Sequence, residues 1–173
     1  MDRLHPRIRV VWGLRSLVRA VLLAAVAGLL AYGLERVAAG AGAAGPPTSP
    51  LPPAATAVAV FVPFAALGLA FTVLRYRAWG YEVGEDTLVI ERGVLTNVRT
   101  VVPYVRVQHV DTRRGPVARL LGLGRVVVYT AGSRGADVAV PGLAADRTAA
   151  LQETLRRLAI ESEPEAGDAG DAV

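Results

Sequence analysis

The residues best spaced for chemistry are His109 and Asp111, which stand at i and i+2 and therefore share one face of a predicted strand. A histidine beside a carboxylate can act as a general base or help to bind a metal ion. The chain has two histidines, and the second, His5, lies in the N-terminal leader, so no His, Asp and Glu cluster has metal-ligand spacing. A strand histidine hydrogen-bonded to a neighbour is the simpler interpretation, and we expect no catalytic residue and no metal.

Two further motifs fail for lack of the correct surroundings. The sequence Gly122-Leu123-Gly124-Arg125 resembles a phosphate loop, but it precedes a predicted strand and lacks the following helix and lysine. Ser133 lies in a hairpin loop, and there is no Gly-x-Ser-x-Gly element. Without cysteine, disulfides, thiolate metal sites and a cysteine nucleophile are excluded. The sequence therefore predicts a protein that is not an enzyme and binds no cofactor.

Arginine supplies the remaining candidate chemistry, since all 19 basic residues are Arg and none is Lys. Six arginines of the predicted β domain are candidate contacts for anionic lipid headgroups or a partner: Arg99, Arg106, Arg113, Arg114, Arg119 and Arg134. A solvated face beside Asp and Glu residues explains them as well, so both readings stay open. Nucleic acid is not expected as a partner, because few exposed aromatic side chains offer a surface for stacking.

Charges are nearly absent from residues 20–74, where only Glu35 and Arg36 occur. Residues 51–74 are uncharged and would form about 36 Å of helix, enough for a hydrocarbon core of about 30 Å. The first stretch, residues 20–34, reaches spanning length if Arg19 extends its side chain to the headgroups. A cleavable signal peptide is the alternative for this first stretch.

These patterns predict the following order. We expect a basic cytoplasmic leader (1–16), a transmembrane helix (17–36), an external Ala/Gly/Pro loop (37–53), a second transmembrane helix (54–74), a β domain with a C-terminal helix (79–160) and a disordered acidic tail (161–173). Arginines precede the first span and follow the second, whereas the connection between the spans contains only Arg36. By the positive-inside rule, both termini are expected in the cytoplasm, and the protein is expected in the cell membrane as a multi-pass protein. The expected interface anchors are Trp12, Arg19, Tyr32, Arg75, Tyr76, Arg77 and Trp79.

From residue 79 onward, short runs rich in Val, Ile, Tyr and Thr alternate with turn residues. The predicted strands are residues 81–83, 87–92, 98–102, 105–112, 125–130 and 137–140. A change of phase in the apolar alternation near Gln108 and His109 indicates a β-bulge. Residues 116–122 are typical of a short helical turn that ends at glycine, and an apolar stripe from Ala144 to Leu158 predicts a terminal helix.

In this order and spacing the chain resembles a known family. The residues that carry the resemblance are Tyr81-Glu82-Val83, Leu88-Val89-Ile90, Arg92-Gly93-Val94-Leu95, Val102-Pro103-Tyr104-Val105-Arg106-Val107-Gln108-His109-Val110 and Gly115-Pro116-Val117-Ala118-Arg119-Leu120-Leu121-Gly122-Leu123. Together with two preceding hydrophobic helices they resemble the bacterial pleckstrin-homology-like domains of the YdbS type over residues 10–160. The resemblance implies an α+β membrane protein in which a partly open, antiparallel β-barrel of about seven strands is capped by a C-terminal helix. It implies an interaction module and no enzyme.

The expected partners are membrane lipids and either a protein partner or further copies of the same chain, with no small-molecule substrate. The leading hypothesis is a non-enzymatic module that docks a protein at the cytoplasmic membrane face. The alternative is recognition of anionic lipid headgroups by the Arg-rich face of the β domain.

Overall fold

The computed structural model describes residues 1–40, 51–131 and 137–162. Arg134, Ser133, the acidic tail from residue 163 and most of the expected external loop lie outside the described residues. The chain divides into two compact units. One consists of residues 9–74, and the other joins residues 1–8 to the residues from Arg75 onward.

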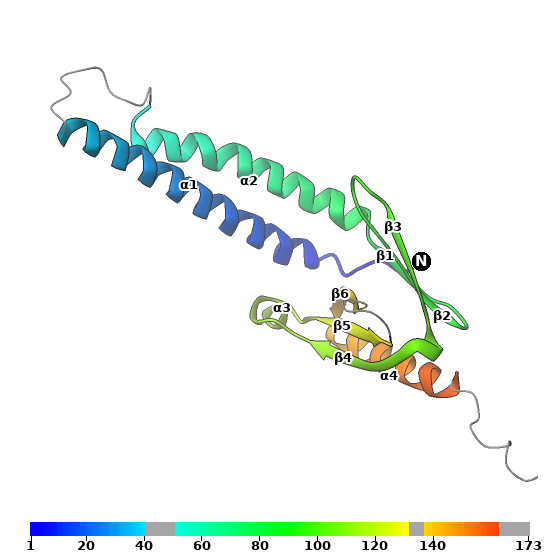
Figure 1. Cartoon of the computed structure of the whole chain (residues 1–173). Coiled ribbons are helices and arrows are strands. Elements are labelled where there is room, and N and C mark those ends of the chain that lie inside the picture. Colours follow the sequence, from blue (N-terminus) through cyan, green and yellow to red (C-terminus); the bar gives the residue numbers. More distant parts are fainter. Residues whose placement is uncertain (41–50, 132–136, 163–173) are drawn as a thin grey trace, which may run out of the picture. The chain divides into compact units, whose positions relative to one another are not determined.

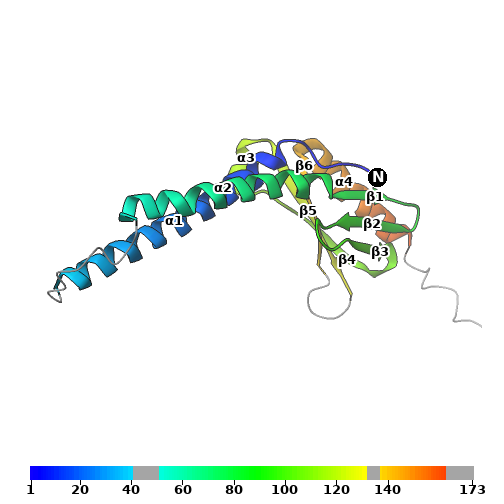
Figure 2. The same ribbon diagram turned by 90° about the horizontal axis from the view of Figure 1, so that it is seen from above.

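The helical unit is an antiparallel pair, α1 (Ile8–Gly40) and α2 (Pro53–Arg77), which lie side by side in both views (Figures 1 and 2). Small residues allow a close approach. A Cβ atom added at Gly28 would lie 3.1 Å from the Cβ of Ala57, and one added at Gly68 would lie 2.9 Å from the Cβ of Ser16. Close packing at small residues is typical of helix pairs in membranes, where apolar side chains gain nothing by leaving lipid.

Large apolar side chains cover the outside of this pair. Leu29, Val37 and Leu67 are 71%, 73% and 68% exposed. Both helices are long and apolar enough to cross a membrane, and only a small share of each is buried inside the protein. A core helix of a water-soluble protein would bury such residues. An apolar solvent around α1 and α2 accounts for their exposure.

The second unit contains two three-stranded antiparallel sheets, in the orders β1-β2-β3 and β4-β5-β6. The strands are β1 (Gly80–Val83), β2 (Thr87–Arg92), β3 (Val98–Pro103), β4 (Val107–Arg113), β5 (Leu123–Thr130) and β6 (Val138–Ala144). The expected barrel is wrong, because the two sheets do not join into one. Between β3 and β4 the chain turns through a 3-10 helix, η1 (Tyr104–Arg106), directly after Pro103, which has no N–H to continue a ladder.

Three local predictions are confirmed. The register of β4 against β5 shifts between Val107 and His109, where the alternation indicated a bulge. The short helix α3 (Pro116–Leu120) is followed by Gly122 at φ +68°, a backbone conformation that favours glycine. The terminal helix α4 (Ala145–Glu161) lies along β4 and β5 (Figure 1).

One face of α4 packs against the second sheet. Thr148, Leu151 and Leu155 are its buried residues. A Cβ at Gly124 in β5 would lie 2.7 Å from Oγ1 of Thr148, so glycine lets helix and strand approach closely. The helix therefore covers the sheet as the apolar stripe predicted.

Residues 1–8, here called the N-terminal segment, are part of the β unit. Asp2 and Tyr81 of β1 exchange two backbone hydrogen bonds, of 2.7 and 3.1 Å, and the backbone N–H of His5 donates to the carbonyl oxygen of Gly142 in β6 at 2.8 Å. Leu4 and Ile8 are only 2% and 4% exposed. The segment thus connects an edge of the first sheet to the second, where the sequence indicated only a charged leader.

Tyr104 of η1 anchors the turn between the two sheets. Its side chain is 1% exposed, and its hydroxyl lies 2.9 Å from the carbonyl oxygen of Gly84 and 3.1 Å from that of Thr87. Burial raises the pKa of Tyr104, and the negative charge of Asp86 raises it further. The neutral phenol is therefore the form that the fold stabilises.

Candidate functional site

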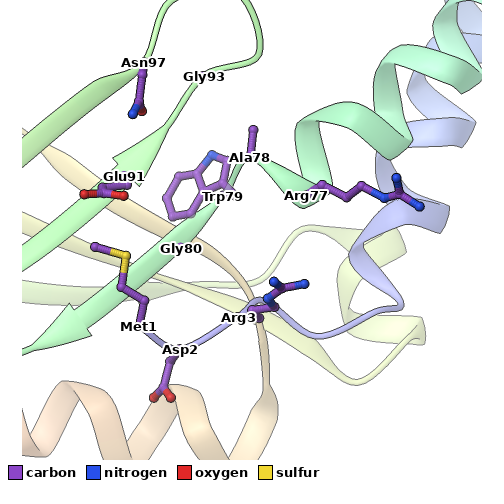
Figure 3. Close-up of a pocket in the computed structure, with 10 residues that line it drawn as sticks. All are labelled: Met1, Asp2, Arg3, Arg77, Ala78, Trp79, Gly80, Glu91, Gly93 and Asn97. Carbon is purple, nitrogen blue, oxygen red and sulfur yellow. The ribbon is translucent and has the colours of Figure 1, made fainter.

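A cavity of about 450 Å³ opens in the β unit where three segments meet. Its lining residues are Met1, Asp2 and Arg3 of the N-terminal segment, Arg77, Ala78, Trp79 and Gly80 at the α2–β1 junction, and Glu91, Gly93 and Asn97 of the β2–β3 hairpin. Figure 3 shows the Trp79 ring among these residues, with the side chains of Arg3 and Arg77 on the same side of the ring. The hairpin can turn here because Gly93 has φ +129°, where an added Cβ would lie 1.8 Å from the carbonyl oxygen of Thr96.

The cavity has an excess of positive charge. Its two acidic residues form ion pairs with arginines that do not line the cavity. Asp2 lies 3.7 Å from the guanidinium of Arg147, and Glu91 lies 3.5 Å from that of Arg99. Among the residues that the structure describes, Arg3 and Arg77 have no acidic partner within ion-pair distance. Two uncompensated cations therefore line one small space.

Trp79 contributes a neutral donor beside these cations. Its side chain is 6% exposed, and in the described part of the chain its indole nitrogen has no hydrogen-bond partner. Among the described residues, every side-chain nitrogen or oxygen that is buried from solvent has a hydrogen-bond partner. The indole N–H is therefore accessible, and the amide of Asn97, which also lines the cavity, is a second neutral donor.

Tyr81, the residue that receives the N-terminal segment, is buried close to this region. Burial raises the pKa of Tyr81, and the charge of Asp2 raises it further, whereas Arg147 acts in the opposite direction. The ion pair of Asp2 with Arg147 therefore lies over the joint between the N-terminal segment and β1.

The predicted Arg contacts do not gather at the cavity. Arg99 pairs with Glu91, Arg113 contacts the Tyr129 hydroxyl and pairs with Asp111 at 3.7 Å, and Arg114 donates to the carbonyl oxygen of Ala145 at 3.2 Å. Arg106 lies in η1 and Arg119 in α3, both exposed. Their role in contacting lipid or a partner stays a prediction.

The predicted interface anchors fall into exposed and buried groups. Tyr32 is 46% exposed and accepts a hydrogen bond of 2.8 Å from Nε of Arg36, whereas Trp12 is 7% exposed. The Tyr76 hydroxyl donates to the carbonyl oxygen of Leu4 at 3.1 Å, which links the end of α2 to the N-terminal segment. Arg19 is exposed on α1, and Arg75, like Arg77, lies in the last turn of α2. Anchoring in headgroups stays a prediction for all seven.

The imidazole ring of His109 packs against an aromatic neighbour. Its ring stacks on Tyr129 with centroids 4.2 Å apart, while Asp111 pairs with Arg113. Within residues 1–40, 51–131 and 137–162, no three His, Cys, Asp or Glu side chains could hold a metal ion together. The geometry thus gives the pair at positions 109 and 111 a structural explanation.

A second surface of interest follows the chain along β3. Leu95, Val98, Val101 and Val105 are 94%, 42%, 50% and 56% exposed. Strand β3 is the last strand of its sheet and pairs with β2 along one edge. A terminal strand with exposed apolar residues is a surface to which another strand can be added.

Sequence reasoning did not connect Arg3 with Arg77, because Arg3 precedes α1 and Arg77 is the last residue of α2, with both helices between them in the sequence. The one available signal was the position of Leu4 and Ile8 among the charged residues at the start of the leader. Their burial in the β unit brings Arg3 to the end of α2.

The fold defines a class: a membrane protein in which two transmembrane helices carry a small β unit closed by a C-terminal helix. The family model described as bacterial PH domain matches residues 18–159, and the chain belongs to this family. A relative from Bacillus subtilis (strain 168), UPF0699 transmembrane protein YdbS, is 36% identical over 86 residues, which cover 50% of this chain and 52% of the relative. The match thus spans about half the length of that relative. No solved structure matches significantly.

Proposed function

We propose that the protein is a non-enzymatic, membrane-anchored module whose PH-like domain docks a protein chain along β3. The observation that carries this proposal is a set of exposed apolar residues at a terminal strand: Val98 and Val101 in β3, Leu95 in the turn before it and Val105 in η1 after it. Soluble domains rarely leave such a set uncovered along a strand that can still pair.

A second copy of the chain is the first occupant to test. Copies anchored in one membrane present the same strand at the same depth, and confinement to a surface raises their effective concentration. A weak contact along β3 is then sufficient for association. A different membrane protein that offers a strand at this depth would use the same edge.

Because the chain has no cysteine, single cysteines can be introduced without interference. Val101→Cys, in native membranes under mild oxidation, is expected to form a disulfide-linked dimer. Leu120→Cys is the matched control, since Leu120 is 87% exposed but lies in α3. Equal dimer yields from both variants would contradict self-association through β3, and a photoreactive residue at position 101 that yields no adduct would contradict docking of any protein there.

We further propose that both termini are cytoplasmic and that the protein crosses the cell membrane twice. Two features support this: arginines concentrate outside the two helices, and residues 1–8 belong to the same compact unit as the β domain. Segments that fold together lie on one side, which requires an even number of crossings between them. Cleavage after the first helix would remove the N-terminal segment from the domain.

Impermeant thiol labelling in intact cells tests this topology. A cysteine at position 48 is expected to react from outside, and a cysteine at position 162 only after lysis. Labelling of both positions in intact cells would overturn the proposed orientation.

A further inference from the structure

We propose that the cavity between the N-terminal segment, Trp79 and the β2–β3 hairpin binds the phosphate group of an anionic phospholipid headgroup, held between Arg3 and Arg77. This site is separate from the β3 surface and from the Arg-rich face that the sequence suggested. Its basis is the charge balance of the lining. Both acids already pair with other arginines, while both cations lack an acidic partner among the described residues.

The donor set suits a phosphate. Two guanidinium groups supply charged, forked N–H donors, the type that binds phosphate oxygens in pairs. The accessible indole N–H of Trp79 and the amide of Asn97 add neutral donors on the same lining. A volume of about 450 Å³ is within the range of small-molecule sites and accommodates a phosphodiester with its glycerol.

The position along the chain favours lipid as the source of that phosphate. Arg77 is the last residue of α2, a transmembrane helix, and Trp79 follows two residues later. Chain continuity places Arg77 and Trp79 next to the end of the second span, which favours a position near the headgroup phosphates. A ligand that is concentrated there needs only a weak site to keep it occupied.

Trp79 makes the site directly observable. The chain has two tryptophans, so Trp12→Phe leaves Trp79 as the sole fluorophore. The full chain carrying Trp12→Phe is reconstituted in vesicles that contain brominated phosphatidylglycerol or, at equal mole fraction, brominated phosphatidylcholine. Bromine quenches nearby indole fluorescence, and we expect the anionic lipid to quench Trp79 more strongly at every mole fraction.

Arg3→Gln with Arg77→Gln should remove this preference. Since each arginine near an anionic surface contributes roughly fivefold to binding, loss of the pair should lower the affinity for the anionic lipid about 25-fold. Arg156→Gln with Arg157→Gln is the matched control, because it removes the same charge from α4, away from the cavity lining. That control should change the affinity less than twofold.

Three results would overturn the proposal: equal quenching by both lipids, unchanged affinity in the Arg3 and Arg77 double variant, or an equal loss in the control.

Inorganic phosphate distinguishes the sources of the ligand. If millimolar phosphate displaces the lipid only weakly, the lipid assignment is supported, whereas displacement at the affinity of the lipid itself would make the site one for soluble anions. Both double variants are compared by urea unfolding, and a tenfold loss of lipid affinity in a variant with the wild-type midpoint excludes misfolding as the cause.

Discussion

Replacing Leu4 by alanine tests whether the N-terminal segment is an integral part of the β domain. Leu4 is 2% exposed although it is one of the first residues of the chain. The substitution removes three carbon atoms from a packed environment, which costs about 2.4 kcal/mol in transfer free energy at about 0.8 kcal/mol per carbon. With the cavity that remains, the free energy of unfolding should fall by about 3 kcal/mol, within the range of about 2–5 kcal/mol found for such changes.

The control makes the same chemical change at a surface position. Leu120→Ala removes the same atoms from a side chain that is 87% exposed, so its effect should stay within about 0.5 kcal/mol. Both variants are unfolded in urea as full chains in non-ionic detergent, and the Trp12→Phe background reports the β domain through Trp79. With an m-value of about 1–3 kcal/mol/M, the midpoint of the Leu4 variant should be about 1–3 M lower.

A null result would be informative. If Leu4→Ala and Leu120→Ala unfold at the same urea concentration, the packing of residues 1–8 contributes nothing to the domain. Residues 79–160 would then be a complete folding unit, as the sequence alone predicts, and the positive charge of Arg3 would have no fixed place beside Arg77.

Three further changes separate other contributions. Gly28→Leu should weaken the α1–α2 pair, because its side chain would meet Ala57, whereas Gly33→Leu, with open space around it, should not; helix pairing in micelles measured by energy transfer distinguishes them. Gly142→Ala should cost at least about 1 kcal/mol more than Gly122→Ala in urea unfolding, since both have positive φ but only Gly142 also meets Ile8, at 2.7 Å; equal losses would mean that backbone strain alone acts. Tyr104→Phe should lose about 1–2 kcal/mol at neutral pH. The pKa of Tyr104 is raised in the fold, so the contribution of its neutral form is complete below the unfolded pKa of about 10 and is lost as pH rises through the folded value. The difference between wild type and Tyr104→Phe should therefore shrink above pH about 10, and a constant difference up to pH about 12 would contradict the assignment.

The elements of this fold could be predicted from local patterns. The two helices follow from uninterrupted apolar residues, and β2 matches its predicted bounds because Val89 and Ile90 lie between clear turn signals. The bulge in β4 was visible because a single-residue insertion moves every later side chain to the other face.

Contacts between distant residues could not be predicted in the same way. An eight-residue stretch with mixed polarity does not reveal that Asp2 pairs with Tyr81 or that His5 reaches Gly142. The cavity depends on that pairing, since it brings Arg3 to Arg77. A barrel was expected from the family resemblance, yet whether β3 and β4 join depends on the conformation of η1, which no local pattern specified.

The pairing of the N-terminal segment also has a consequence for biosynthesis. Residues 1–8 are translated before both hydrophobic helices, but the strands that receive them, β1 and β6, are translated only after those helices. Residues 1–8 must therefore remain without their final neighbours while α1 and α2 enter the bilayer. If α1 inserted in the reverse orientation, Leu4 and Ile8 would lie on the other side of the membrane from β1 and β6. Folding of the domain therefore depends on correct insertion of α1.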